Sequence, residues 1–254
     1  MEMYNFLAMI KSFDDIWEIV ERLRAPDGCP WDRAQTNESI KFDLVEEAYE
    51  VLDAIDKKDW NSLKEELGDV IFLAMLHAKI AEDEGKFSHD EVIDTIVKKM
   101  IYRHPHVFGE KKFENEEELL ENWEKSKGYG IFEHVNFSLP ALMLAQKIGN
   151  RARRVGFDWL NGEDVLEKIK EELEELGKAH SKEEIEEEIG DLLFSIVNYA
   201  RHKNINAEEA LRNTLKKFVK RFSYIEKRAR EMGKDLEQMT LEEMDTLWEE
   251  AKKK

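Results

Sequence analysis

Two pairs of acidic residues on consecutive helical segments constrain the fold of this chain more than any other feature. Glu47 and Glu50 stand three residues apart, and so do Glu66 and Asp69. Residues at that spacing lie on one face of a helix. The polar turn between the segments is short, which favours an antiparallel pair of helices. The stretch 46–69 therefore predicts a helical hairpin whose carboxylates face one another.

The same pattern returns in the second half of the chain. Glu172 and Glu175 repeat the first acidic pair, and Glu188 and Asp191 repeat the second. The surrounding segments recur in the same order at a nearly constant offset, which is the mark of a duplicated unit. We therefore expect two tandem units, residues 1–130 and 131–254, divided at the Gly-Tyr-Gly sequence that ends at Gly130.

The composition favours helices throughout. The 254 residues include only 4 Pro and 12 Gly, and Glu, Lys, Leu and Ala are abundant. No segment has a strong strand pattern, so the expected fold class is all-α. Apolar residues recur at helical spacing, which predicts helices over residues 13–24, 37–56, 60–84, 88–102, 115–127, 140–154, 163–179, 181–202, 206–231 and 240–252.

Charge and hydropathy exclude several classes of function. A formal net charge of -18 argues against binding to duplex nucleic acid, which needs a basic surface. No uncharged apolar run reaches the length of a membrane span, so we expect no membrane partner. The start of the sequence lacks the pattern of a signal peptide. A lone Cys29 fits a reducing compartment, and we expect a cytoplasmic location.

The acidic pairs are interpreted as metal ligands rather than as solvated surface. Glu66 and Asp69 lie beside Leu67, Val70 and Leu73 on an apolar segment, where carboxylates need a partner. Oxygen ligands suit Mg²⁺, with Mn²⁺ as a possible substitute. A di-iron bundle would use Glu-x-x-His pairs. None of the 7 histidines has a glutamate three residues before it, which favours the oxygen-only site.

Basic and aromatic residues repeat beside the acidic segments. Lys99 and Arg103 stand four apart, and Lys217 and Arg221 repeat them in the second unit. Such cations either complement a helix C-terminus or bind phosphate oxygens. Several tryptophans and lysines have two open interpretations, packing in the core or contact with a nucleotide. They are Trp31, Trp123, Lys127, Trp159, Trp248 and Lys252.

The order of several motifs resembles one known family. The stretches CPWDRAQT, EEAYEVLDAI, EELGDVIF, RHPHVFGE, AQKIGNRARRVGFDW and EIGDLLFSIVNYAR are similar to those of the MazG family of tandem-domain nucleoside triphosphate pyrophosphohydrolases. The resemblance covers nearly the whole chain. It implies two tandem helical-bundle units of the all-α NTP pyrophosphatase type, completed by dimerisation as a homodimer. It also implies hydrolysis of an NTP or dNTP to NMP and pyrophosphate, a reaction that removes unwanted nucleotides from the pool (house-cleaning).

The resemblance assigns roles to the repeated residues. The implied Mg²⁺ ligands are Glu47, Glu50, Glu66, Asp69, Glu172, Glu175, Glu188 and Asp191. Lys99, Arg103, Lys217 and Arg221 are expected to stabilise the pyrophosphate leaving group. Glu46 and Glu171 precede the ligands and are rotated by about 100° around the helix, which makes them candidates either for the general base or for residues that orient the ligands. Tyr102 departs from the family, because many members carry a second Arg there.

Two alternatives remain open from the sequence. The first is a helical scaffold or dimerisation protein with weak or no catalytic activity. The second is a narrow-specificity relative such as a dUTP pyrophosphatase. All eight ligand positions hold Glu or Asp, whereas a scaffold would be expected to have lost some of them.

Overall fold

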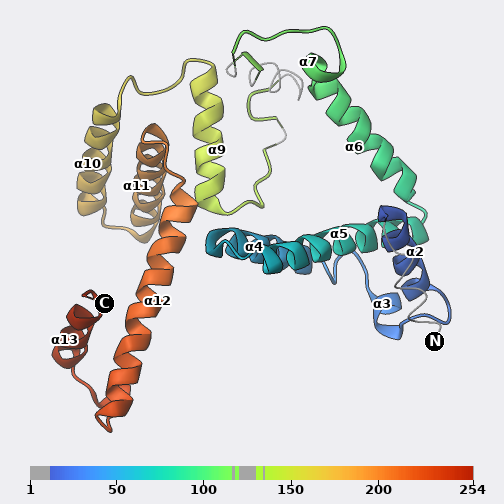
Figure 1. The fold of residues 1–254 in the computed structure, drawn as a ribbon. Helices are drawn as coiled ribbons and strands as arrows, with labels where there is room; N and C mark the ends of the chain where they lie inside the picture. The colour runs from blue at the N-terminus through green and yellow to red at the C-terminus, as the bar shows by residue number, and fades with distance from the viewer. Residues whose placement is uncertain (1–11, 116–117, 120–129, 134, 254) are drawn as a thin grey trace. The chain divides into compact units, whose positions relative to one another are not determined.

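The computed structural model describes residues 12–115, 118–119, 130–133 and 135–253, and every regular element in these ranges is a helix (Figure 1). The expected all-α class is therefore confirmed. The chain folds as two compact units, Met1–Glu114 and Asn115–Lys254. The sequence places the boundary at Gly130 instead. Most residues between these two points lie outside the described ranges, so the division at Gly130 stays a prediction.

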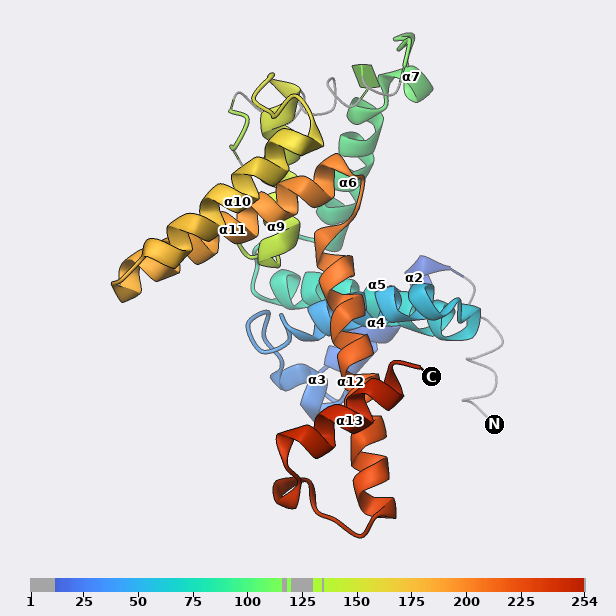
Figure 2. The ribbon, with the colours of Figure 1, turned by 90° about the vertical axis from the view of Figure 1, so that its left-hand side faces the viewer.

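The N-terminal unit is built around a hairpin of two antiparallel helices, α4 and α5, which run alongside each other (Figure 2). Lys58 turns the chain with a positive φ of 55°, and the Asp59 side chain caps α5 by accepting from the backbone of Asn61 and Ser62. The helices of this unit are α2 (Phe13–Arg24), α3 (Pro30–Ala34), α4 (Asp43–Lys57), α5 (Trp60–Asp83), α6 (His89–Arg103) and α7 (Pro105–Phe108).

The buried core of this unit lies along the second half of α5. Val20 of α2 and Ile40 pack there against Leu73, Leu76 and Ile80. Glu66 and Asp69 belong to the first half of α5, beyond this core. The core thus fixes the helix pair at one end and leaves the other end to carry the carboxylates.

The C-terminal unit repeats the hairpin with α10 and α11, and α11 also packs against α9. The start of α12 contacts α9 and α11, while its second half forms a small core with α13 from Ile225, Ala229, Met239 and Leu247 (Figure 1). The elements of this unit are α9 (Ala141–Arg154), α10 (Gly162–Lys178), α11 (Lys182–His202), α12 (Ala207–Glu231), the 3-10 helix η1 (Leu236–Gln238) and α13 (Leu241–Ala251).

The helix boundaries follow the sequence expectations closely, with one clear exception. Helix α4 begins at Asp43, although the sequence predicted a start near Asn37. The side chains of Thr36 and Ser39 accept from each other's backbone N–H groups at 3.1 and 2.9 Å. These bonds close a turn that competes with the helix. The short helices α3 and α7 were not predicted, and most of the helix expected over 115–127 lies outside the described residues.

Across the described residues, no helix has the length and hydropathy needed to cross a membrane.

Candidate metal and phosphate site

The hairpin of the N-terminal unit brings three carboxylates together. Glu47 projects from α4, and Glu66 and Asp69 project from α5. One carboxylate oxygen of each residue lies within 4.8 Å of the others. Spacing of three residues on α5 and the antiparallel packing of α4 together produce this convergence.

The hairpin of the C-terminal unit repeats the cluster. Glu172 of α10 lies with Glu188 and Asp191 of α11, again with one oxygen of each within 4.8 Å of the others. Glu172 is the most enclosed of the three, with only 4% of its surface exposed. The duplication inferred from sequence therefore extends to the geometry of the clusters.

The fourth expected ligand of each unit stands outside these groups of three. Glu50 and Glu175 are exposed, yet the charge of each raises the pKa of a glutamate in its cluster. Burial raises the pKa of Glu66, and the negative charge of Glu50 raises it further. Burial also raises the pKa of Glu188, with the charge of Glu175 as the next cause.

The clusters fit a hard divalent cation. Burial raises the pKa of Glu47, and repulsion from the Asp69 and Glu50 carboxylates raises it further. All of the donors are carboxylate oxygens, which Mg²⁺ and Mn²⁺ prefer. Bringing a divalent cation between these oxygens would turn mutual repulsion into attraction. Each hairpin thus has the donor set of a metal site.

A lysine lies against the C-terminal cluster. The Nζ atom of Lys168 is 2.7 Å from Oε1 of Glu172 and 2.9 Å from Oε1 of Glu171. The hydrogen bonds to these carboxylates raise the pKa of Lys168. Sequence reasoning overlooked this residue, although its spacing of four from Glu172 is the ordinary signal of an ion pair on a helix. Glu171 and Glu46, the two candidate bases, are both exposed, and Glu171 is also bound by this ammonium group.

The expected phosphate-binding residues of the C-terminal unit lie together. Lys217 and Arg221 of α12 and Lys252 after α13 line one pocket of about 430 Å³. Trp248 lies beside it, and its ring centroid is 5.5 Å from the guanidinium carbon of Arg221. Three further lining residues were missed, although they continue the helical spacing of the cations on α12: Lys220, Tyr224 and Lys227.

Only part of the corresponding set in the N-terminal unit belongs to the described residues. Lys99 and Arg103 lie at the end of α6, which packs against α5 and α7. Helix α6 follows the C-terminal end of α5, and Asp69 lies about 21 Å before that end at 1.5 Å per residue. Within the described ranges, no ion pair joins either cation to the cluster. Trp123 and Lys127 lie outside the described residues.

The two tryptophans that precede the acidic helices differ in exposure. Trp31 is 59% exposed, whereas Trp159 is half-buried. The backbone N–H of Trp159 donates to Asp158, which the Arg201 guanidinium binds from α11. The loop that carries Trp159 is thereby tied to the helix that carries Glu188.

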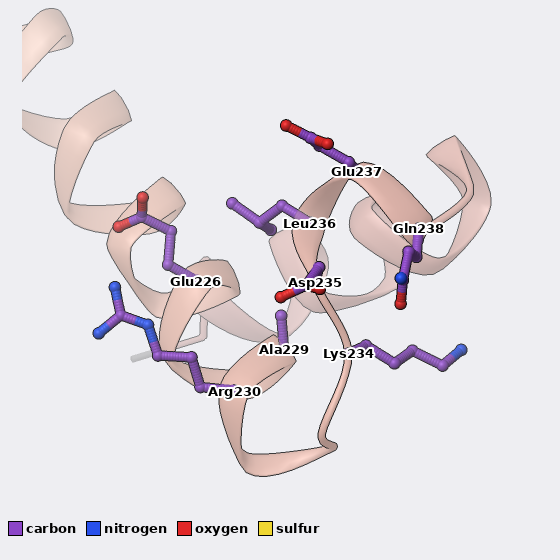
Figure 3. A pocket seen from close by; sticks show the side chains of 8 residues that line it. All are labelled: Glu226, Ala229, Arg230, Lys234, Asp235, Leu236, Glu237 and Gln238. Atoms are coloured by element: carbon purple, nitrogen blue, oxygen red, sulfur yellow. The ribbon is translucent and has the colours of Figure 1, made fainter.

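A second pocket of the C-terminal unit lies away from the carboxylate cluster. It has a volume of about 390 Å³ and is formed by the end of α12 and the segment leading into η1. Figure 3 shows Glu226 and Arg230 projecting from α12 on one side of it, with Glu237 and Gln238 on the other. Its lining mixes both signs of charge, and none of the expected ligands belongs to it.

The fold and the two clusters define a class: an all-α protein of two tandem units, each with an oxygen-donor cluster on a helical hairpin. The sequence profile of the MazG nucleotide pyrophosphohydrolase domain matches residues 35–108 and again residues 161–225. Each matched segment contains one of the two carboxylate clusters. The chain belongs to the MazG nucleotide pyrophosphohydrolase family, a family of metal-dependent enzymes.

Two relatives that match nearly the whole chain are named as nucleoside triphosphate pyrophosphohydrolases. A Thermotoga maritima protein named nucleoside triphosphate pyrophosphohydrolase/pyrophosphatase MazG is 46% identical over 94% of this chain and 95% of its own. An Escherichia coli K12 protein named nucleoside triphosphate pyrophosphohydrolase is 38% identical over 96% of this chain and 98% of its own. A crystal structure of a MazG-related protein from Thermotoga maritima covers 45% of this chain and 97% of its own, at 33% identity and a TM-score of 0.40.

Proposed function

We propose that this protein hydrolyses nucleoside triphosphates to nucleoside monophosphates and pyrophosphate in a Mg²⁺-dependent reaction. The proposal rests on one observation above all, the convergence of three carboxylates within 4.8 Å in each unit. The names of the relatives that match nearly the whole chain support the choice of substrate and reaction. Such an enzyme would remove unwanted nucleotides from the pool.

The acidic residues would hold the metal and shape the reacting end of the site. Glu47, Glu66 and Asp69, with Glu50 beside them, would hold it in the N-terminal unit. Their counterparts in the C-terminal unit would be Glu172, Glu175, Glu188 and Asp191. When bound, Mg²⁺ neutralises phosphate oxygens and makes a bound water more acidic.

Other residues would bind the triphosphate and move the proton. Lys217 and Arg221 would bind the phosphates that leave as pyrophosphate, and Lys99 and Arg103 would do so in the first unit. Water adds to the α phosphorus of the triphosphate. The bond from that phosphorus to the oxygen bridging it to the β phosphate breaks, and pyrophosphate leaves with the electron pair. The water proton would pass to Glu46 or Glu171.

The remaining expected residues would hold the nucleoside. Tryptophan rings stack on bases without strong selectivity, which suits a broad NTP substrate range. The candidates for this contact are Trp31, Trp123, Trp159 and Trp248, with Lys127 and Lys252 adding charge.

We further propose a homodimer located in the cytoplasm. Among the described residues of the N-terminal unit, α6 has no fully buried side chain, although it carries Val92, Ile93, Ile96, Val97 and Ile101 on its exposed surface. An apolar helix face of this kind is expected to be covered by another protein surface. A second copy would supply that surface and bring additional cations to each cluster.

The reaction is tested by identifying the products from a panel of NTPs and dNTPs, including dUTP, with and without EDTA. We expect NMP and pyrophosphate, with turnover abolished by EDTA and restored by Mg²⁺. NDP and orthophosphate would show that another bond is broken. No turnover of any nucleotide would favour a scaffold, and turnover of dUTP alone would favour a narrow-specificity enzyme.

A further inference from the structure

The C-terminal cluster contains a cation of its own. Lys168 lies one helical turn before Glu172 on α10, and its ammonium group is 2.7 Å from the Glu172 carboxylate. The Glu172 side chain is only 5% exposed, so its side of the contact is shielded from solvent. The lysine side chain is 33% exposed and therefore has room to move away.

The N-terminal cluster has the opposite charge at the same position. Asp43 stands four residues before Glu47, as Lys168 stands four residues before Glu172. Asp43 is half-buried at the first turn of α4. Within the part of the chain that the structure describes, no ion pair joins a lysine or arginine to Glu47, Glu66 or Asp69.

This difference changes what a divalent cation must do on binding. In the N-terminal unit the cation relieves repulsion among carboxylates that no lysine or arginine of the described residues pairs with. In the C-terminal unit it must share or displace the ammonium group on Glu172. At this helix position the two units differ by two elementary charges, Asp43 against Lys168. Affinity at carboxylate sites depends on the charge of the ligand set and its surroundings.

We propose that Lys168 is a built-in counter-cation of the C-terminal cluster, which keeps Glu172 in place without metal and weakens metal binding there. The N-terminal cluster then binds a divalent cation more tightly, by on the order of tenfold or more. This inference rests on the proposed metal sites. It adds that the two units fill with metal at different concentrations, so that metal supply controls them separately.

Metal binding measured on the full-length chain tests the difference. Glu66→Gln disables the N-terminal cluster and leaves the C-terminal one to be titrated with Mn²⁺, and Glu188→Gln does the reverse. Calorimetry or the electron paramagnetic resonance signal of free Mn²⁺ gives each affinity without using activity. We expect the Glu188→Gln protein to bind Mn²⁺ at least about tenfold more tightly than the Glu66→Gln protein.

Substitution of the lysine then tests the cause. In the Glu66→Gln background, Lys168→Met keeps the aliphatic stem and should tighten Mn²⁺ binding by about tenfold. Lys170→Met is the matched control, because Lys170 contacts Glu167 at 2.7 Å rather than the cluster. In the Glu188→Gln background, Asp43→Asn should weaken binding, and Asp43→Lys should weaken it further.

The outcomes separate this inference from the metal sites themselves. Equal affinities in the two backgrounds, or a Lys168→Met protein that binds Mn²⁺ no more tightly, would overturn the inference and leave both metal sites standing. If neither protein binds Mn²⁺ at its remaining cluster, while circular dichroism shows intact helical content, the inference and the proposed function are both overturned.

Discussion

Arg201 binds Asp158 through both of its terminal nitrogens. Nη1 donates to Oδ2 at 2.8 Å, and Nη2 donates to Oδ1. Both side chains are largely buried, and Nε2 of His202 is 3.2 Å from the same carboxylate. The pair joins the loop before α10 to the end of α11, two segments separated by 43 residues.

Loss of this pair is expected to destabilise the protein in a pH-dependent way. The Arg201 hydrogen bonds lower the pKa of Asp158 from 3.8 to about 2. A lowered folded-state pKa gives stability that is present above pH 3.8 and is lost as the pH falls through about 2. Asp158→Asn should therefore reduce the free energy of unfolding by about 2 kcal/mol at neutral pH.

The measurement is urea unfolding of both proteins between pH 7 and the lowest pH at which they stay folded. The difference between them should shrink as the pH falls below 4. Asp245→Asn, at an exposed position of α13, is the control and should have little effect. A difference that does not change with pH would show that Asp158 acts through packing instead.

Arg221 is expected to matter for substrate rather than for metal. Arg221 lines one pocket together with Lys217 and Lys252. Arg221→Ala should lower kcat/KM by about 10- to 100-fold, because charge-assisted hydrogen bonds to phosphate are lost. Mn²⁺ affinity should not change. Arg212→Ala on the same helix removes a cation that pairs with Glu208 instead, and it should leave kcat/KM nearly unaltered.

The proposed dimer predicts a specific effect of charge on α6. Ile93 and Val97 stand one turn apart and are 53% and 47% exposed in the single chain. The Ile93→Asp/Val97→Asp double variant should shift the protein from dimer toward monomer in sedimentation experiments, because buried unpaired charges are costly. Val155→Asp, which alters an exposed apolar residue after α9, is the control. A monomeric wild-type protein would contradict the proposal.

Much of the fold was predictable because its signals are local. The helices predicted over 13–24, 88–102, 181–202 and 240–252 begin at or directly after a serine or threonine that forms a capping box: Ser12, Ser88, Ser181 and Thr240. The acidic pairs were predictable for the same reason, since residues three apart share a helix face whatever the rest of the chain does.

The features that the sequence did not reveal depend on contacts across the fold. Asp158 meets Arg201 only because the hairpin brings α11 back to the loop before α10. Both Glu47 and Glu50 lie on α4, but only Glu47 comes within 4.8 Å of Glu66 and Asp69. The way α4 packs against α5 decides between them, and the sequence does not reveal it. Lys168 was visible as an ion-pair spacing, but only the burial of Glu172 shows that the lysine belongs to the site.

The most direct test of the central claim removes one carboxylate from each cluster and leaves the fold intact. NTP hydrolysis is measured for wild type, Glu66→Gln, Glu188→Gln and the double variant, with circular dichroism and Mn²⁺ titration on each. We expect the double variant to keep its helical content, to bind no Mn²⁺ at the clusters and to lose at least about 100-fold in turnover. A folded double variant that still releases pyrophosphate at close to the wild-type rate would contradict it.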